Sequence, residues 1–83
     1  MYAIEFAPSA LRQFEKLDRE AQARIAAALE RCRVRPHEFA VRLVGSPYYR
    51  IRAGDYRAII DIKDRVLIVF VLKVGHMENI IRK

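Results

Sequence analysis

The first six residues of the chain have the pattern of a β-strand. Tyr2, Ile4 and Phe6 alternate with Ala3 and Glu5, which is the two-residue period of a strand with one buried face. The alternation stops after Phe6, so the pattern predicts a short N-terminal strand.

Residues 9–35 change to the period of α-helices. Ser9 is the predicted N-cap of a short helix, and Asp18 is the predicted N-cap of a longer one. The longer helix has apolar side chains at spacings of three and four residues, which places one stripe against a core. This stripe consists of Ile25, Ala28, Leu29 and Cys32. The helix should end before Pro36, because a proline disfavours helical geometry at the residue before it.

The second half of the chain predicts an antiparallel meander. After a loop or short extended segment over residues 36–47, the pattern favours strands over residues 48–53, 56–62 and 65–74. Lys63 and Asp64 form the predicted turn before the third of these strands, and Gly75 is its predicted end. Because nearly every position of that strand is apolar, we expect it to be central and covered on both faces.

These elements define an α+β domain. Their order is β-α-α-β-β-β, and the two N-terminal helices are expected to pack on one face of a mainly antiparallel sheet. A chain of 83 residues is long enough for one domain only, which therefore spans residues 1–83.

The register of the first hairpin follows from its turn. Gly54 and Asp55 are predicted to form a two-residue turn of type II′, which requires glycine at its first central position. The residues flanking the turn then pair, and one face of the hairpin is apolar and aromatic. This core face consists of Tyr49, Ile51, Ala53, Tyr56, Ala58 and Ile60. A shift by one residue would turn arginines into the core, which argues against it.

Three arginines share the opposite face of this hairpin. Arg52 lies directly across from Arg57, and Arg50 lies two residues further along the strand. Like charges directly opposite each other destabilise a ladder, so the pattern predicts a polyanion on this face, and a phosphodiester backbone fits. The alternative is that Asp61, on the same face by its spacing, neutralises one of the three.

The net charge is concentrated in the same region. The chain has a formal charge of +6, and residues 31–57 hold seven arginines, no lysine and only two carboxylates. Arginine offers a planar fork that matches phosphate oxygens, so this composition indicates a nucleic-acid or acidic-protein surface. The alternative is a solvated face in a chain that uses arginine where others use lysine.

Composition argues against several other classes of protein. The longest apolar run covers residues 66–72, which is far short of the about 20 residues that a membrane helix needs. The N-terminus lacks the pattern of a signal peptide. Cys32 is the only cysteine, so it supports neither an internal disulfide nor a zinc site. We therefore expect a cytoplasmic domain with no membrane contact, no metal and no small-molecule cofactor.

The hairpin sequence resembles that of the RelE/ParE toxin superfamily. The resemblance is carried by YRIRAGDYR at residues 49–57 and by VGH at residues 74–76. Residues 2–6, with Pro8, Ala10, Lys16 and Leu17, are similar to the family's first strand and helix, and residues 43–45 to its LxG segment. The resemblance spans the whole chain.

This resemblance implies a small basic toxin that an acidic antitoxin neutralises. RelE-type members cut messenger RNA in the ribosomal A site without a metal ion, whereas ParE-type members poison DNA gyrase. The likeness is closer to the RelE branch, so the ribosome and messenger RNA are expected partners. The basic hairpin residues of RNA-cutting members match Arg50, Arg52 and Arg57. The match implies that Arg52 and Arg57 stabilise charge on the reacting phosphate and that Arg50 positions the substrate.

The tail departs from the RNA-cutting pattern. Relatives that cut RNA usually have an arginine and a tyrosine where this chain has Met77 and Ile81. His76, whose imidazole titrates near neutral pH, either compensates as a catalytic residue or is a loop histidine without a role. The departure leaves open a weakened nuclease, different chemistry, a ParE-type gyrase poison, or a module that binds RNA or an antitoxin without chemistry.

Four further residues are candidates for binding RNA. Arg31, Arg33 and Arg35 crowd the end of the second helix, where they either contact ribosomal RNA or remain solvated. Tyr48 shares the face of Arg50, so its ring is a candidate for stacking on a base.

Overall fold

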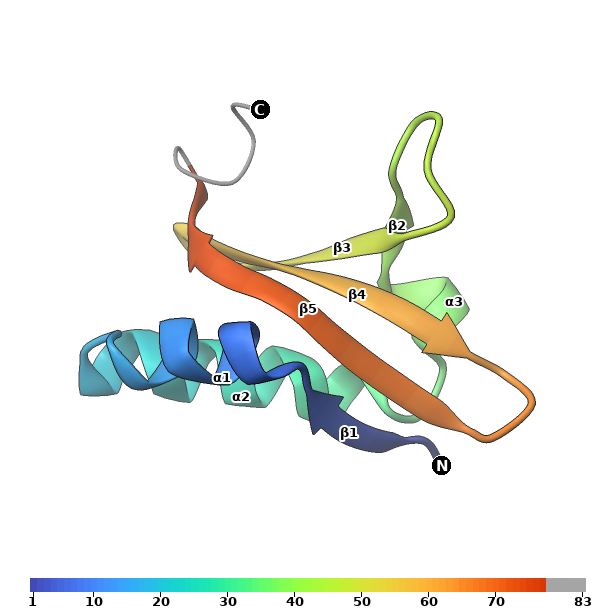
Figure 1. The fold of residues 1–83 in the computed structure, drawn as a ribbon, viewed down its shortest axis with the longest axis horizontal. Helices are drawn as coiled ribbons and strands as arrows, with labels where there is room; N and C mark the ends of the chain where they lie inside the picture. The colour runs from blue at the N-terminus through green and yellow to red at the C-terminus, as the bar shows by residue number, and fades with distance from the viewer. Residues whose placement is uncertain (78–83) are drawn as a thin grey trace.

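The computed structural model describes residues 1–77, which form one sheet with helices on one side (Figure 1). The elements in chain order are β1 (Ala3–Phe6), α1 (Pro8–Glu15), α2 (Arg19–Cys32), α3 (Pro36–Phe39), β2 (Val41–Arg42), β3 (Tyr49–Ala53), β4 (Tyr56–Lys63) and β5 (Ile68–His76). The predicted order is confirmed, and the segment expected to be a loop or short extended piece contains α3 and β2.

The five strands form a mixed sheet in the order β1-β5-β4-β3-β2. β1 runs parallel to β5, and the other neighbouring pairs are antiparallel. β5 is therefore an interior strand with β1 and β4 on either side, as its apolar sequence favours, although β4 and not β5 is the middle strand of the five. The expectation that it is covered on both faces is wrong: Val69 and Val71 are fully buried, whereas Phe70 between them remains partly exposed. The apolar side chains of β5 on its other face, such as Phe70, are flanked by strands β1 and β4 but have no layer of helices from residues 1–77 over them.

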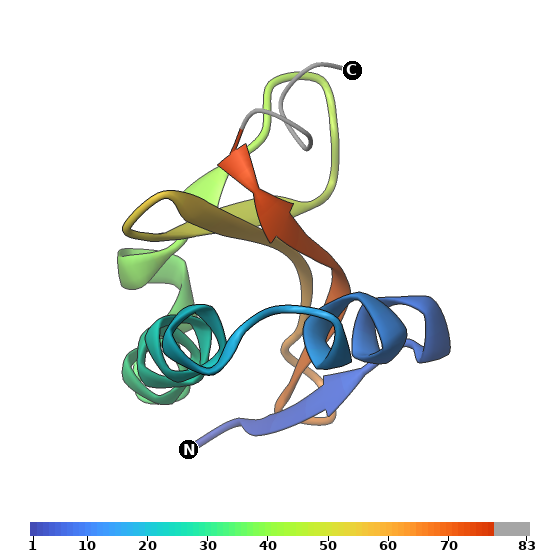
Figure 2. The ribbon, with the colours of Figure 1, turned by 90° about the vertical axis from the view of Figure 1, so that its left-hand side faces the viewer.

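Helices α1 and α2 lie side by side under the same face of the sheet (Figures 1 and 2). α1 packs on β5, and α2 packs on β3 and β4. The core between the layers includes Ile25 from α2, Ile51 from β3 and Ile60 from β4, each exposed by 2% or less. The whole predicted stripe of α2 is buried, which confirms the helical period read from the sequence. We call the sheet face that packs on the helices the core face and the opposite one the outer face.

The two main helices begin in different ways. The Asp18 carboxylate accepts a hydrogen bond of 2.8 Å from the backbone N–H of Ala21, so the predicted N-cap of α2 is confirmed. The predicted N-cap at Ser9 is wrong, because α1 begins at Pro8 with Ala7 as a cap that makes no side-chain hydrogen bond. Proline suits this first position, since its φ is already helical and its missing N–H would have no partner there. Pro36 begins α3 in the same way.

The turn between β3 and β4 has the predicted geometry. Gly54 has a φ of +64°, and Asp55 is not among the residues with positive φ, as a type II′ turn requires. The register is also the predicted one, with Ala53 paired to Tyr56 and Arg52 paired to Arg57.

The connection between β4 and β5 differs from the prediction. β4 continues to Lys63 and β5 starts only at Ile68, so the connection is longer than the expected Lys63-Asp64 turn. Asp64 is held in this connection by the Tyr2 hydroxyl, which donates a hydrogen bond of 2.6 Å, and by His37 Nε2 at 2.8 Å. Both partners hold the pKa of Asp64 below its usual value. These partners come from distant parts of the chain, so local turn chemistry does not reveal them.

A β-bulge interrupts the pairing of β4 with β5. Ile60 pairs with Val71 and Ile59 pairs with Lys73, so Leu72 is an extra residue on β5. Bulges of this kind shift the alternation of side chains by one position. Val74 is therefore buried in the core, and Lys73 is exposed on the outer face.

We predict that Gly54→Ala destabilises the fold. A side chain at a φ of +64° is strained, and an added Cβ would lie 2.7 Å from the Arg24 Nη1 atom, so this guanidinium must move. The expected loss of unfolding free energy is about 1–2 kcal/mol, measured by urea denaturation. Gly45→Ala is the control for strain alone, because its φ is +71° with nothing within 4 Å. An unchanged urea midpoint for Gly54→Ala would contradict this account of the turn.

Candidate nucleic-acid interface

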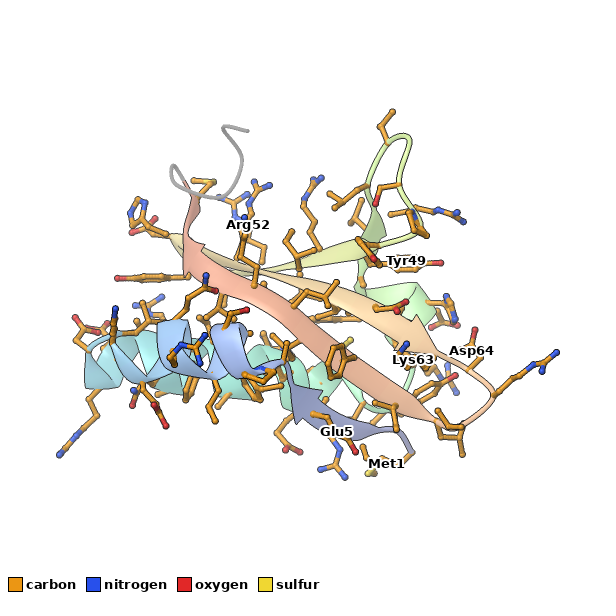
Figure 3. All side chains as sticks on the ribbon, in the orientation of Figure 1. Met1, Glu5, Tyr49, Arg52, Lys63 and Asp64 are labelled. Carbon is orange, nitrogen blue, oxygen red and sulfur yellow. The ribbon has the colours of Figure 1, made fainter. Side chains whose placement is uncertain are left out.

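Arg50, Arg52 and Arg57 project from the outer face of the β3–β4 hairpin, and we call this group the arginine face. Arg52 and Arg57 are directly paired across the strands, and Arg50 pairs with Ile59 one step further along. Figure 3 shows Arg52 on the side of the sheet away from the helices. Ile51, Ala53 and Ala58, which alternate with these arginines, are buried in the core. The predicted division between a core face and a cationic face is therefore confirmed.

The charges of the arginine face are not compensated within the described part of the chain. None of the three arginines forms an ion pair with a carboxylate of residues 1–77. Arg52 Nε donates a long hydrogen bond of 3.4 Å to the carbonyl oxygen of Gly54. The Nε atom of Arg57 is buried and has no hydrogen-bond partner. Desolvation, followed by repulsion from Arg50 and Arg52, lowers the pKa of Arg57.

Asp61 does not neutralise the arginines. Its carboxylate accepts a hydrogen bond of 3.1 Å from the ammonium group of Lys63. Asp61 and Lys63 lie within the last three positions of β4, whereas Arg57 is its second residue, and Figure 3 shows Lys63 at the far end of this strand from Arg52. The alternative, in which Asp61 neutralises one of the three arginines, is therefore wrong. Asp61 is paired with Lys63 instead, and no carboxylate of residues 1–77 forms an ion pair with the arginine face.

The structure does not bring His76 to the arginine face. His76 is paired with Tyr56 on the neighbouring strand, and the two rings meet edge to face with centroids 5.4 Å apart. Directly paired residues share a face of the sheet, and Tyr56 packs against the core. The imidazole therefore lies on the face opposite the three guanidiniums, and a catalytic role for it stays a prediction that this arrangement does not support.

The arginines at the end of α2 form a separate group, and each has a local partner. Arg33 donates to the carbonyl oxygen of Tyr2 at 2.8 Å and forms an ion pair of 3.1 Å with Glu30. Arg35 lies 3.7 Å from Glu38, and Arg31 lies over the ring of Phe39. These contacts give Arg31, Arg33 and Arg35 structural roles at the junction of α2 and α3. A contact with ribosomal RNA stays a prediction for them.

Tyr48 lies just before β3 and has 38% of its surface exposed. Its backbone N–H donates a hydrogen bond of 3.0 Å to the hydroxyl oxygen of Ser46, which fixes the backbone while the ring remains accessible. Exposure of this kind is compatible with the predicted stacking on a base, and that role stays a prediction.

Lys73 is the cation that the sequence pattern did not reveal. Counting by two from Val69 and Val71 places residue 73 on the core face, but the bulge at Leu72 turns its side chain outward. It shares a row of the sheet with Ile59 and Arg50. The available signal was the charge itself, since Lys73 is the only charged residue in residues 66–75 and a lone lysine is costly to bury.

Two further properties of residues 1–77 bear on the kind of site. Their His, Cys, Asp and Glu side chains form no group of three or more that could hold a metal ion. None of the helices in this part of the chain combines the length and apolar content required to cross a bilayer.

Comparisons with known proteins identify related sequences. The sequence model of the family described as "ParE toxin of type II toxin-antitoxin system, parDE" matches residues 4–81. An Escherichia coli protein described as a RelE-like toxin is 34% identical over 81 residues, which cover 94% of this chain and 85% of that protein.

Solved structures show the same fold in toxins of this kind. The isolated E. coli RelE toxin superposes with a TM-score of 0.82 at 28% identity, covering 92% of this chain and 84% of that one. The intact E. coli RelBE toxin–antitoxin complex gives 0.80 at 27% identity, covering 92% and 96%. The Mycobacterium tuberculosis RelBE2 complex gives 0.79 at 26% identity, covering 90% and 96%. The chain therefore belongs to the RelE/ParE family of toxins from type II toxin–antitoxin systems.

Proposed function

We propose that this toxin arrests translation by cutting messenger RNA on the ribosome, and that the arginine face holds the reacting phosphate. The observation that carries the proposal is the direct pairing of Arg52 with Arg57, neither of which forms an ion pair with a carboxylate of residues 1–77. Two cations in this position repel each other until an anion lies over both. A phosphodiester supplies two unesterified oxygens for such a site.

The proposed reaction is an internal displacement at phosphorus. The ribose 2′-oxygen forms a bond to the adjacent phosphorus, and the bond from phosphorus to the 5′-oxygen of the next nucleotide breaks. One proton leaves the 2′-hydroxyl and another reaches the departing 5′-oxygen. Negative charge increases on the nonbridging oxygens, and fixed cations stabilise it more in the transition state than in the ground state.

The three arginines have different positions for this task. Arg52 and Arg57 are adjacent, so both guanidiniums can serve one phosphate, whereas Arg50 is one row away and positions the strand. Arginine remains protonated at any physiological pH, so none of the three is proposed to move protons. Arg57 has the strongest reason to bind an anion, because its charge is partly desolvated and lacks a partner within residues 1–77.

The toxin is proposed to be neutralised by an acidic antitoxin. The formal charge of +6 favours an acidic partner. Two of the similar structures are toxin–antitoxin complexes, which supports a protein partner for this chain as well.

Poisoning of DNA gyrase is the second candidate function. Two observations favour it: the matching family model is described as a ParE toxin, and Met77 stands where RNA-cutting relatives have an arginine. Supercoiling by purified gyrase and translation in a purified extract distinguish the two candidates. The proposed nuclease blocks translation and leaves supercoiling unchanged, whereas the alternative has the opposite effect.

We predict that Arg52→Ala combined with Arg57→Ala abolishes growth arrest. Removal of one oxyanion-stabilising group typically costs about 10²- to 10³-fold in rate, so the double variant should leave no cleavage detectable above background. Growth after induction and mapping of cleaved messenger ends on ribosomes measure the effect.

The control for that experiment is Arg12→Ala combined with Arg19→Ala. Both of these arginines are exposed and lie on helices α1 and α2, so this variant loses the same net charge from the other layer. It should remain toxic. Toxicity of the Arg52/Arg57 variant equal to that of the parent would refute the assignment of the site.

We also predict that the tail limits the rate of cleavage. The backbone N–H of Met77 donates a hydrogen bond of 2.8 Å to the carbonyl oxygen of Asp55, so this position is fixed beside the turn of the arginine hairpin. Met77→Arg with Ile81→Tyr should raise cleavage about tenfold or more, which corresponds to about 1.4 kcal/mol of added transition-state stabilisation. Position 81 lies outside the described residues. An unchanged rate in a ribosome-based cleavage assay would point to different chemistry.

A further inference from the structure

Lys73 adds a fourth cation to the outer face beside the arginine face. The pairing of β4 with β5 sets Gly75 opposite Arg57 and Lys73 opposite Ile59. Lys73 is therefore diagonal to Arg57 across two neighbouring strands, a relation that separates positions by about 7–8 Å. The distance suits contacts to neighbouring groups of one ligand rather than a shared contact to a single oxygen.

The position of Lys73 depends on the bulge at Leu72. Without this extra residue, the alternation that buries Val69 and Val71 would direct residue 73 into the core. The structure instead exposes Lys73 and buries Val74. β5 thus places a cation on the outer face, while its apolar side chains continue to pack against the helices on the core face.

Lys73 has no compensating carboxylate within residues 1–77. Lys63, the other lysine of the outer face, differs in this respect, because it is paired with Asp61 and lies 5.8 Å from the centre of the Phe70 ring. Of these two lysines, only Lys73 therefore presents a charge that a ligand can use without first breaking an ion pair.

Carboxylates restrict the direction in which an anionic chain can leave the arginine face. Further along the strands, the next outer-face row contains Asp61 on β4, Phe70 on β5 and Glu5 on β1. Asp61 is already paired with Lys63, so this row offers a polyanion no unpaired cation, and the carboxylate of Glu5 on β1, which has no ion-pair partner within residues 1–77, would repel it. A path across the strands, from Arg50 and Arg52 on β3 to β5, encounters Lys73 instead.

We propose that the RNA backbone crosses β3, β4 and β5 at the end of the sheet near the β3–β4 turn. Lys73 then binds a phosphate next to the one held by Arg52 and Arg57. This inference rests on the proposed function for the identity of the polyanion. Lys73 is a positioning residue, since it contacts the backbone beyond the reacting phosphate. Lysine suffices for that task, because a phosphate bound without regard to sequence requires a positive charge and no fixed fork geometry.

The test compares Lys73→Ala with Lys63→Ala in the purified full chain. The probe is a short, unstructured oligoribonucleotide with 2′-O-methyl groups throughout, which cannot undergo the internal displacement. Its dissociation constant is measured at several salt concentrations. Loss of one phosphate contact should weaken binding uniformly across oligonucleotide sequences and reduce the salt slope by about 0.7 to 1. Lys63→Ala removes the same charge and should leave the slope unchanged, and Lys73→Arg should restore it.

Each outcome decides the inference separately from the proposed function. If the wild-type chain does not bind this probe, or if Lys73→Ala and Lys63→Ala give the same slope, the path across β5 is wrong. That result leaves cleavage of messenger RNA that depends on Arg52 and Arg57 intact. A reduced slope for Lys73→Ala, together with uncut messenger RNA on ribosomes, would retain the path and reject the nuclease. Circular dichroism and urea midpoints of the two alanine variants check that the fold is unchanged.

Discussion

The repulsion between Arg52 and Arg57 is the physical constraint on which the proposed function depends. The two guanidiniums share one cross-strand position because the type II′ turn at Gly54 fixes the register. A shift by one residue would relieve the repulsion only by turning Ile51 and Ala58 out of the core and arginines into it. Burial of the core face therefore holds together two charges that would otherwise separate. The arginines of the outer face therefore stay close together without a carboxylate partner from residues 1–77.

The two faces of the sheet differ in composition and in surroundings. The core face packs on α1 and α2 and contains the fully buried side chains Ile51, Ile60, Val69 and Val71. The outer face carries the cations near the β3–β4 turn and the Asp61–Lys63 pair toward the other end of β4. Because the helices cover only the core face, the residues that stabilise the fold differ from those proposed to bind a ligand. Substitutions of the outer cations are therefore expected to change binding without unfolding the domain.

Membership in the toxin family explains the scaffold more completely than it explains the chemistry. The similar structures share the fold at 26–28% identity, and a shared fold does not by itself establish a shared reaction. The resemblance read from the sequence assigns Arg50, Arg52 and Arg57 to the family's basic hairpin positions, whereas Met77 and Ile81 depart from the expected tail. The arginines can organise a phosphate and stabilise its charge, but they cannot transfer protons. The hairpin and the tail are thus separable parts of the proposed reaction.

The sequence alone determined the features that depend on local spacing. Periods of two and of three to four residues gave β1, the buried stripe of α2 and the two faces of the hairpin, and Gly54 gave the turn and thus the pairing of Arg52 with Arg57. Only the tertiary structure decided which groups meet from distant parts of the chain. It tied Asp64 to Tyr2 and His37, placed His76 against Tyr56 on the core face, and inserted the bulge that turns Lys73 outward. The reason is physical: alternation along one strand specifies a face only until an extra residue changes its phase, and such an insertion is set by packing against neighbouring strands rather than by local sequence.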